Sequence, residues 1–393
     1  MRGALSRKLE GFGTTIFTEM TRLANERGAI NLAQGFPDFD GPDFAKDAAI
    51  AAIRAGHGQY ARMMGLPEIH RALSEKYLRD YGLAYAPDTE LTVCSGATEA
   101  IFAAIQGTCD AGDEVVLFEP WYDSYKASVV MAGAVPRTVR LRTPDWSFDR
   151  SEVRRVFSAK TRVLLLNSPH NPTGKVFARE ELELLAGLCR EFGTICVTDE
   201  VYEHLVYDGH RHVPMASLPG MRERTITISS FGKTFSLTGW KIGWAAAPPE
   251  LTAAVRAAHQ FITFATATPL QLGAAAALHA GPEYYAELAA EYRERRDYLV
   301  EALSRIGFDV TPPSGTYFAC ADFRPFGFDD DRSFVRHLIE EVGVAAIPPS
   351  VFYEDPTRPQ TYVRFAFCKK RETLAAAVER LGALAARRAG ARA

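Results

Sequence analysis

One run of the chain reads Thr225-Ile226-Thr227-Ile228-Ser229, and it is followed directly by Ser230-Phe231-Gly232-Lys233-Thr234. β-branched residues favour strands, and this run is one of four similar short runs, the others being 115–118, 163–166 and 195–198. Continuous runs of this kind indicate strands that are buried on both faces of a sheet. Helical patterns precede and separate these runs, for example at residues 98–106 and 179–191. This alternation predicts an α/β fold with a mostly parallel central sheet and helices on both of its faces.

The pattern changes at about Pro282, where a long charged segment begins. One stripe of a helix is formed by Tyr285, Leu288, Tyr292, Leu299 and Leu303. Strand-like pieces follow at 317–321 and 362–367, with a helical pattern at 332–342. We therefore predict a large domain over residues 44–281 and a smaller α+β domain over 282–393, with the N-terminal segment 1–43 packing with the smaller domain.

Composition excludes several classes of protein. The chain has 393 residues, 47% of them hydrophobic and 24% charged, and a net charge of -3, so we expect a soluble globular protein with no nucleic-acid partner. Its six cysteines are scattered without a Cys-x-x-Cys pair, which favours reduced thiols and a cytoplasmic location. Neither a secretion signal nor an apolar run of about 18–20 residues is visible, so we expect no association with a membrane.

Polar side chains follow the predicted strands, at the sheet edge where α/β proteins bind ligands. Asn171 lies in the loop after the run 163–166, Asp199 and Tyr202 follow 195–198, and Lys233 follows 225–229. A further strand at 91–94 leads into Ser95-Gly96-Ala97, which opens a helix and forms a ready anion site. Each feature alone has an ordinary explanation as a turn residue, a helix cap or a solvated charge.

Taken together, these residues fit the requirements of pyridoxal phosphate (PLP). Its phosphate needs N–H and hydroxyl donors, and its pyridinium nitrogen needs a carboxylate. Its phenolic oxygen needs hydrogen-bond donors, and its aldehyde needs a lysine amine. The sequence therefore predicts a PLP site at this sheet edge.

Several specific motifs, spread over residues 16–381, add to the prediction of a PLP site. They are Asn31-Leu32-Ala33-Gln34-Gly35-Phe36-Pro37-Asp38-Phe39, Gln59-Tyr60, Phe118-Glu119-Pro120-Trp121-Tyr122, His170-Asn171-Pro172-Thr173-Gly174, Ser229-Ser230-Phe231-Gly232-Lys233 and Tyr362-Val363-Arg364-Phe365. With them the chain resembles a fold-type-I PLP aminotransferase of class I/II. The resemblance is strongest to the branch of kynurenine, glutamine and methionine aminotransferases.

The resemblance implies a role for each residue that matches a motif. Lys233 would carry the cofactor as an imine and shuttle the proton, and Asp199 would pair with the pyridinium nitrogen. The remaining cofactor contacts would be Tyr202 and Asn171 at the phenolic oxygen, Tyr122 stacked on the ring, and Gly96, Ala97, Ser230 and Lys241 at the phosphate. Many relatives carry arginine where this chain has Lys241, and a lysine contacts phosphate as a point charge rather than a fork. Ring stacking by Tyr122 rather than Trp or Phe is a milder departure.

Substrate contacts and assembly follow from the same resemblance. Arg364 would grip the substrate carboxylate, with help from the Gly35 backbone and Asn171, while Phe17 would line the side-chain pocket. Tyr60 would reach the phosphate of the neighbouring subunit, which implies a homodimer with shared active sites. Transfer of an amino group from an L-amino acid to a 2-oxo acid would then follow ping-pong kinetics.

Substrate choice rests on aromatic residues expected near the pocket, which are Phe17, Phe36, Trp121, Tyr122, Phe352 and Tyr353. They favour hydrophobic, sulfur-containing or aromatic amino acids, or glutamine. No second arginine is evident for a side-chain carboxylate, although Arg62 lies near Tyr60 and could approach the neighbouring site.

Three alternatives stay open. The first is β-elimination from cysteine S-conjugates at the same site. The second is biosynthetic transamination of an unusual amino acid, such as an arginine derivative or a succinylated diaminopimelate derivative. The third is a PLP-binding regulator without catalytic activity, which the intact set Lys233, Asp199 and Arg364 argues against.

A group of histidines raises the question of a metal site. His204, His210 and His212 are close in sequence but are separated by the turn Asp208-Gly209. We interpret them as part of a surface loop and predict no metal ion.

Overall fold

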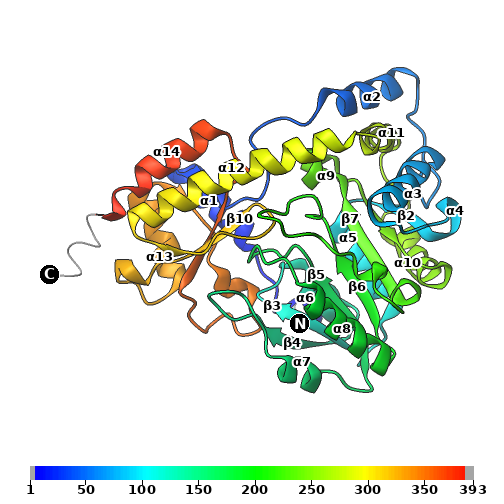
Figure 1. The fold of residues 1–393 in the computed structure, drawn as a ribbon, viewed down its shortest axis with the longest axis horizontal. Coiled ribbons are helices and arrows are strands. Elements are labelled where there is room, and N and C mark those ends of the chain that lie inside the picture. The colour runs from blue at the N-terminus through cyan, green and yellow to red at the C-terminus, as the bar shows by residue number, and fades with distance from the viewer. Residues whose placement is uncertain (1–4, 386–393) are drawn as a thin grey trace.

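The computed structural model describes residues 5–385 (Figure 1). Seven strands form its main sheet, and in spatial order they are β2 (Leu91–Cys94), β8 (Gly243–Ala246), β7 (Thr225–Ser230), β6 (Ile195–Asp199), β5 (Thr161–Asn167), β3 (Glu114–Glu119) and β4 (Val135–Arg140). β8 runs antiparallel to both of its neighbours, and every other adjacent pair is parallel. The predicted α/β fold with a mostly parallel sheet is therefore confirmed.

The central strands are buried on both faces, as their sequences predict. In β5, Val163 and Leu165 pack on one side of the sheet with helix α5 (Ala97–Thr108). Leu164 and Leu166 pack on the other side with helix α8 (Arg179–Phe192). Successive side chains of a strand point to opposite faces, so a strand covered by helices on both sides needs an unbroken apolar run.

Two strands of the main sheet escaped prediction for identifiable reasons. β4 lies at the edge of the sheet and includes partly exposed residues, so its sequence carries no continuous apolar run. β8 reads Gly-Trp-Ala-Ala, and glycine and alanine have low strand propensity. Its small residues let the neighbouring turn come close, since a Cβ on Gly243 would lie 2.5 Å from the backbone carbon of Gly96.

The remaining helices of the first part of the chain surround this sheet. They are α2 (Asp43–Arg54), α3 (Pro67–Tyr81), α4 (Pro87–Glu90), α6 (Ser124–Met131), α7 (Arg150–Val156), α9 (Phe231–Thr234), α10 (Pro249–Ile262) and α11 (Thr268–Leu278). Among residues 5–385 no helix is both long enough and apolar enough to cross a membrane.

A second core lies beside the main sheet. Its antiparallel sheet has the order β12 (Tyr362–Ala366), β10 (Phe318–Asp322) and β9 (Asp309–Val310), and β1 (Ile30–Asn31) pairs in parallel with β11 (Val344–Ala345). The helices here are α1 (Ile16–Arg27), α12 (Pro282–Ile306), α13 (Asp331–His337) and α14 (Arg371–Leu381). The helix predicted at 332–342 is α13 followed by a π-helical turn over Leu338–Val342.

Helix α12 links the two cores. It runs from the neighbourhood of α11 to α14 across the molecule (Figure 1). Of the predicted stripe, Leu288, Tyr292, Leu299 and Leu303 are buried, and Tyr285 is partly buried. The buried cluster around them also contains Met20 and Ala24 of α1, so the beginning and the end of the chain share one core.

Candidate active site

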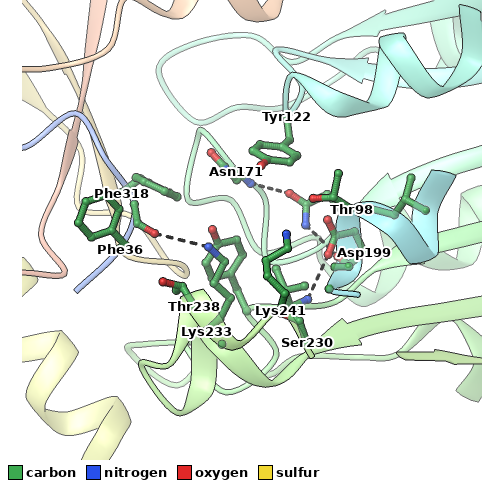
Figure 2. A pocket seen from close by; sticks show the side chains of 18 of the residues that line it. Phe36, Thr98, Tyr122, Asn171, Asp199, Ser230, Lys233, Thr238, Lys241 and Phe318 are labelled. Atoms are coloured by element: carbon green, nitrogen blue, oxygen red, sulfur yellow. Dashed lines mark hydrogen bonds between the residues drawn. The ribbon is translucent and has the colours of Figure 1, made fainter. Parts of the chain in front are cut away.

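One cavity lies at the carboxyl ends of β5, β6 and β7, where the two cores meet (Figure 2). The structure brings together at this cavity every predicted site residue except Tyr60. They are Phe17, Gly35, Gly96, Ala97, Tyr122, Asn171, Asp199, Tyr202, Ser230, Lys233, Lys241 and Arg364.

Lys233 lies in the short helix α9, directly after β7. Its Nζ lies 3.5 Å from the carbonyl oxygen of Gly35 and 5.7 and 5.6 Å from the ring centres of Tyr202 and Tyr317. Burial lowers the pKa of Lys233 to about 8, with a smaller contribution from nearby cations, while Asp199 acts in the opposite direction. An amine with a pKa in this range is partly neutral near physiological pH and can act as a nucleophile or a base.

Asp199 ends strand β6 and faces the cavity floor. Burial raises the pKa of its carboxyl to about 6, and the hydrogen bond from Tyr125 opposes that rise. Tyr125 donates its hydroxyl proton to Oδ2 at 2.6 Å, and the Val201 amide donates to Oδ1 at 3.3 Å. No arginine, lysine or histidine in residues 5–385 forms an ion pair with Asp199 within 4 Å, so this acid is free to pair with a cation in the cavity.

Tyr125 was missed by the sequence reasoning. The sole signal for it was a second tyrosine three residues beyond Tyr122. Two further missed residues, Thr98 and Thr238, line the cavity with hydroxyl-bearing side chains, and Thr238 lies beside Lys233 (Figure 2).

Two asparagines fix the loop after β5. Asn167 donates through Nδ2 to the carbonyl oxygen of Asp199 at 2.8 Å, and its Oδ1 accepts from the Asn171 amide at 2.7 Å. Asn167 thus joins the ends of β5 and β6 and sets the position of Asn171. Asn167 is the last residue of β5 and was given no role from the sequence.

The turn between β2 and α5 forms an anion cradle. Gly96 has φ of 83°, a conformation that strains any residue with a Cβ. A Cβ at this position would also lie 3.0 Å from Nζ of Lys241. Lys241 itself adopts φ of 54°, and strain of this kind clusters at functional sites. The amide groups at the start of α5 and the Lys241 ammonium therefore converge on one anion-binding position.

Arg364 is buried in the middle of β12, with 1% of its surface exposed. Its Nη1 donates to Oδ1 of Asn171 and its Nη2 to the carbonyl oxygen of Ala33, both at 2.9 Å. The Nε has no partner, and no carboxylate of the described residues forms an ion pair with this guanidinium. A buried charge without a counterion is costly, so the arrangement calls for an anionic ligand.

The aromatic residues expected near the pocket fall into two groups. Phe17, Phe36 and Tyr122 line the cavity, and Phe318 joins them. Trp121, Phe352 and Tyr353 are instead buried outside the set of lining residues, with Phe352 packed against Phe17 at a ring distance of 5.9 Å. Phe352 thus supports Phe17 of the cavity wall from behind, and its place in the sequence could not distinguish a supporting residue from a lining one.

Tyr60 lies outside this cavity. It is 87% exposed and packs edge-on against Phe264 at a ring distance of 5.7 Å.

The prediction of a surface loop is wrong for two of the three histidines. His204 stacks on Tyr285 at a ring distance of 4.3 Å, and Nε2 of His212 lies 2.9 Å from Oε2 of Glu200. His210 is exposed. The segment after β6 folds back over the sheet, so polar residues that read as a surface turn become part of a buried network.

The residues at the cavity fit PLP by their own chemistry. Lys233 offers an amine with a depressed pKa, and Asp199 offers a buried carboxyl that no cation among residues 5–385 pairs with. Gly96, Ala97 and Lys241 form an anion cradle, and Tyr122 offers a ring face. A carboxylate for the ring nitrogen, an amine for the aldehyde and an anion site for the phosphate, all at one edge of a doubly wound sheet, define the class of fold-type-I PLP enzymes.

Comparisons with known proteins give the family. The model for "Aminotransferase class I and II" matches residues 27–381, and the chain belongs to that family. The methionine aminotransferase of Escherichia coli K12 is 41% identical, with 95% of this chain and 97% of that protein covered. The kynurenine–oxoglutarate transaminase 3 of Mus musculus is 40% identical, with 95% and 89% covered. The solved N-succinyldiaminopimelate aminotransferase of Mycobacterium tuberculosis is 47% identical, with a TM-score of 0.94 and 97% and 100% covered.

The protein is therefore a PLP-dependent aminotransferase that acts on amino acids and 2-oxo acids. The fold and the branch indicated by the motifs are both confirmed by these relatives.

The depressed pKa of Lys233 predicts how the apoprotein reacts with an aldehyde. Since the protonated amine cannot attack, the rate should rise as Lys233 loses its proton through about pH 8 and level off above pH 9. The neutral fraction, and with it the rate, increases about tenfold between pH 7 and pH 9. The measurement is the growth of absorbance after mixing with pyridoxal, which lacks a titrating phosphate. A rate that keeps rising towards pH 10.5, as for a solvated lysine, would contradict this prediction.

Proposed function

We propose that the cavity residues have the roles that the family resemblance implies. Lys233 would condense with the cofactor aldehyde with loss of water and would be released as a free amine when the substrate amine takes its place. Asp199 would keep the ring nitrogen protonated. The other cofactor contacts are Tyr202 and Asn171 at the phenolic oxygen, Tyr122 on the ring face, and Gly96, Ala97, Ser230 and Lys241 at the phosphate. These residues all line one cavity, which supports this assignment of roles.

The chain's own residues then carry the proton transfers. When bound, PLP supplies an electron-accepting ring that makes the proton on the substrate Cα acidic. Lys233 Nζ, whose pKa is lowered by burial, removes that proton and acts as the general base. Arg364 fixes the substrate carboxylate, with the Gly35 backbone and Asn171 beside it. The amino group leaves one substrate and is given to a second 2-oxo acid, in ping-pong order.

The observation that carries the proposal of an amino-acid substrate is the buried guanidinium of Arg364, which has no counterion in the described part of the chain. A substrate carboxylate supplies the missing negative charge and a partner for the fork. Bidentate pairing of this kind also fixes orientation, which a lysine cannot do.

Replacing Arg364 tests that role directly. We expect Arg364→Met to lower kcat/KM for amino acids by about 10²–10³-fold and Arg364→Lys by about 10-fold, because the charge survives in the second variant without the fork. Steady-state kinetics with several donors measure both values. Affinity for PLP should stay within about threefold of wild type in both variants, since Arg364 does not contact the cofactor in the proposed arrangement. An unchanged kcat/KM in Arg364→Met would remove Arg364 from the substrate site.

The lining of the cavity favours donors with neutral, apolar side chains. Its lysine and arginine residues in this subunit are Lys233, Lys241 and Arg364, and the proposal uses all three for the aldehyde, the phosphate and the α-carboxylate. Phe17, Phe36 and Phe318 form apolar wall. We therefore propose hydrophobic, sulfur-containing or aromatic amino acids, or glutamine, as donors.

A second candidate donor comes from similarity rather than from the cavity. The chain is 47% identical to a protein described as N-succinyldiaminopimelate aminotransferase, whose named substrate carries additional carboxylates. That substrate would need a further cation, which the neighbouring subunit would have to supply.

A donor screen separates these candidates. The purified holoenzyme is assayed with 2-oxoglutarate and methionine, phenylalanine, kynurenine, glutamine or N-succinyldiaminopimelate. Highest kcat/KM with one of the first four supports the neutral-donor proposal, and highest kcat/KM with the succinylated donor overturns it. Incubation with a cysteine S-conjugate and no 2-oxo acid tests the lyase alternative, since pyruvate and ammonia form there only by elimination.

We also propose a homodimer in which Tyr60 reaches the phosphate of the neighbouring subunit. Phe264, which is 47% exposed, packs against Tyr60, and Phe261, three residues earlier, is 86% exposed. Exposed apolar side chains of this kind are what subunit interfaces bury. Sedimentation of the holoenzyme as a monomer would overturn this proposal.

Domain limits and location complete the proposal. We propose domain limits near residues 43 and 281. The pairing of β1 with β11 and the core that α1 shares with the C-terminal helices support them. We propose a cytoplasmic location, which the six buried and unpaired cysteines favour.

A further inference from the structure

A buried acid–base pair lies behind the anion cradle. Glu99 belongs to the first turn of α5, three residues beyond Gly96, and His259 lies near the end of α10, which packs against α5. Nδ1 of His259 lies 2.6 Å from Oε1 of Glu99. His259 has no exposed surface and Glu99 is 8% exposed, so water does not screen the pair.

The hydrogen bonds around this pair fix its protonation. Nε2 of His259 lies 2.9 Å from the Met63 carbonyl oxygen, which can only accept, so Nε2 carries a proton. If Nδ1 had no proton, its lone pair would face Glu99 Oε1 at 2.6 Å, and the contact would be repulsive. The Glu99–His259 pair therefore holds a second proton and is neutral overall. Burial disfavours the charged imidazole, but the hydrogen bond and charge of Glu99 raise the pKa of His259 above its ordinary value.

Glu99 also holds the cradle in shape. Its Oε2 accepts from the amide of Ser95 at 2.6 Å, directly before Gly96. A free carboxylate at this position would repel a phosphate bound at the start of α5. The imidazolium of His259 offsets that charge.

Other nearby groups do not take over this task. Arg256 of α10 donates instead to the Thr92 hydroxyl and to the carbonyl oxygens of Asp88 and Leu91. Cys94 lies within 4.8 Å of the pair, and burial raises the pKa of its thiol well above the usual value, so it stays uncharged. These three residues have metal-ligand chemistry, but both oxygens of Glu99 and both nitrogens of His259 already have protein partners.

We propose that His259 is a positioning residue of the cofactor phosphate site, which acts by neutralising Glu99 and so lets the acid brace the turn without repelling the phosphate. The inference rests on the proposed role of Gly96 and Ala97 in phosphate binding. Under this proposal His259, which lies outside the cavity, contributes to the affinity for the phosphate group.

The test compares two aldehydes that differ by the phosphate. Dissociation constants of the apoprotein for PLP and for pyridoxal are measured in wild type, His259→Gln and the double variant His259→Gln/Glu99→Gln. His259→Gln leaves Glu99 uncompensated, so its PLP affinity should fall by about tenfold or more while pyridoxal affinity changes by less than about threefold. The double variant should recover PLP affinity to within about threefold of wild type, because the offending charge is gone.

A matched control is provided by His70. It is equally buried, and its Nε2 lies 2.8 Å from the carbonyl oxygen of Met64, one residue beyond the carbonyl that His259 contacts. His70→Gln should leave the ratio of PLP to pyridoxal affinity unchanged. The single variant Glu99→Gln gives a test that does not require His259→Gln to fold. Its dissociation constant for PLP should be no more than about threefold above that of wild type.

The outcomes separate two kinds of failure. Equal affinity ratios in wild type and His259→Gln, or a double variant no better than the single one, would overturn the role of His259 and leave the cofactor site intact. A loss of PLP affinity in Glu99→Gln by more than about tenfold would also overturn it. A wild-type apoprotein that binds PLP no better than pyridoxal would instead overturn the proposed phosphate cradle.

Discussion

Replacing Lys233 with alanine is expected to abolish transamination, with kcat lowered by at least about 10⁴-fold. In the proposed arrangement the residue serves twice, since its amine bonds the cofactor aldehyde and later moves the proton at the substrate Cα. Its surroundings provide no substitute, because the other cations at the cavity, Lys241 and Arg364, are assigned to the phosphate and the substrate carboxylate. Steady-state kinetics with the best donor measure the loss.

An absorbance spectrum provides the control for Lys233. Wild type incubated with PLP should show a band at about 360–430 nm that moves to about 330 nm with an amino-acid donor and no 2-oxo acid. Lys233→Ala should lack the donor-dependent change, whereas Lys241→Met should keep it with weaker retention of the cofactor. A Lys233→Ala variant that still converts the band with the donor would place the reactive lysine elsewhere.

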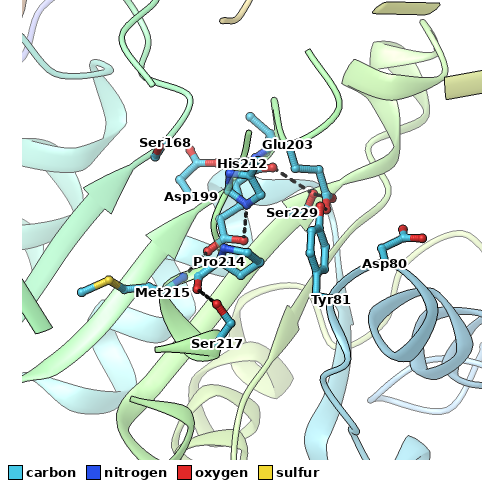
Figure 3. A network of polar contacts seen from close by, with 12 residues as sticks. Asp80, Tyr81, Ser168, Asp199, Glu203, His212, Pro214, Met215, Ser217 and Ser229 are labelled. Carbon is cyan, nitrogen blue, oxygen red and sulfur yellow. Dashed lines mark hydrogen bonds and ion pairs between the residues drawn. The ribbon is translucent and has the colours of Figure 1, made fainter. Parts of the chain in front are cut away.

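Replacing Lys76 with methionine is expected to cost about 3–5 kcal/mol of unfolding free energy. Lys76 Nζ lies 2.6 Å from Oε2 of Glu203, and both side chains are 2% exposed. Tyr81 and Ser229 donate to the same carboxylate, which joins α3 to the ends of β6 and β7 (Figure 3). Burial would raise the pKa of Glu203, but the charge of Lys76 lowers it below its usual range, so the variant leaves a buried anion without its counterion.

Urea unfolding of the apoprotein measures this cost. Lys76→Met/Glu203→Gln should recover a large part of the lost stability, because a neutral amide replaces the unpaired charge. The pair of Lys126 and Glu354, whose side chains are 27% and 48% exposed, serves as a comparison, and Lys126→Met should change the unfolding free energy by less than about 1 kcal/mol. Equal effects of Lys76→Met and Lys126→Met would show that burial does not strengthen the first pair.

Much of the main sheet follows from local patterns. The β-branched run at 225–229 became β7, and the apolar run at 163–166 became the middle of β5, because a strand covered on both faces needs apolar side chains at every position. The pattern could not find β8, since the small residues there serve the close approach of Gly243 to Gly96 rather than strand propensity. It also misread His204 and His212, whose polarity says nothing about the neighbours that bury them.

The candidate site, too, was predictable from the sequence only in part. Its main residues were recognisable because each stands in a local motif at a strand end, as Lys233, Asp199 and Asn171 do. Phe352 was expected near the pocket, and it packs behind the lining residue Phe17, since position in the sequence does not separate a lining side chain from a supporting one.

The order of residues along the chain was enough to specify an α/β sheet, the edge of it that binds a ligand, and the set of side chains suited to PLP. The contacts that tune those side chains depended on the folded chain. Tyr125 meets Asp199 across 74 residues, Lys76 meets Glu203 across 127, and Glu99 meets His259 across 160. Periodicity and turn chemistry record the conformation of neighbouring residues, whereas burial, counterions and shared protons arise only where distant segments pack together.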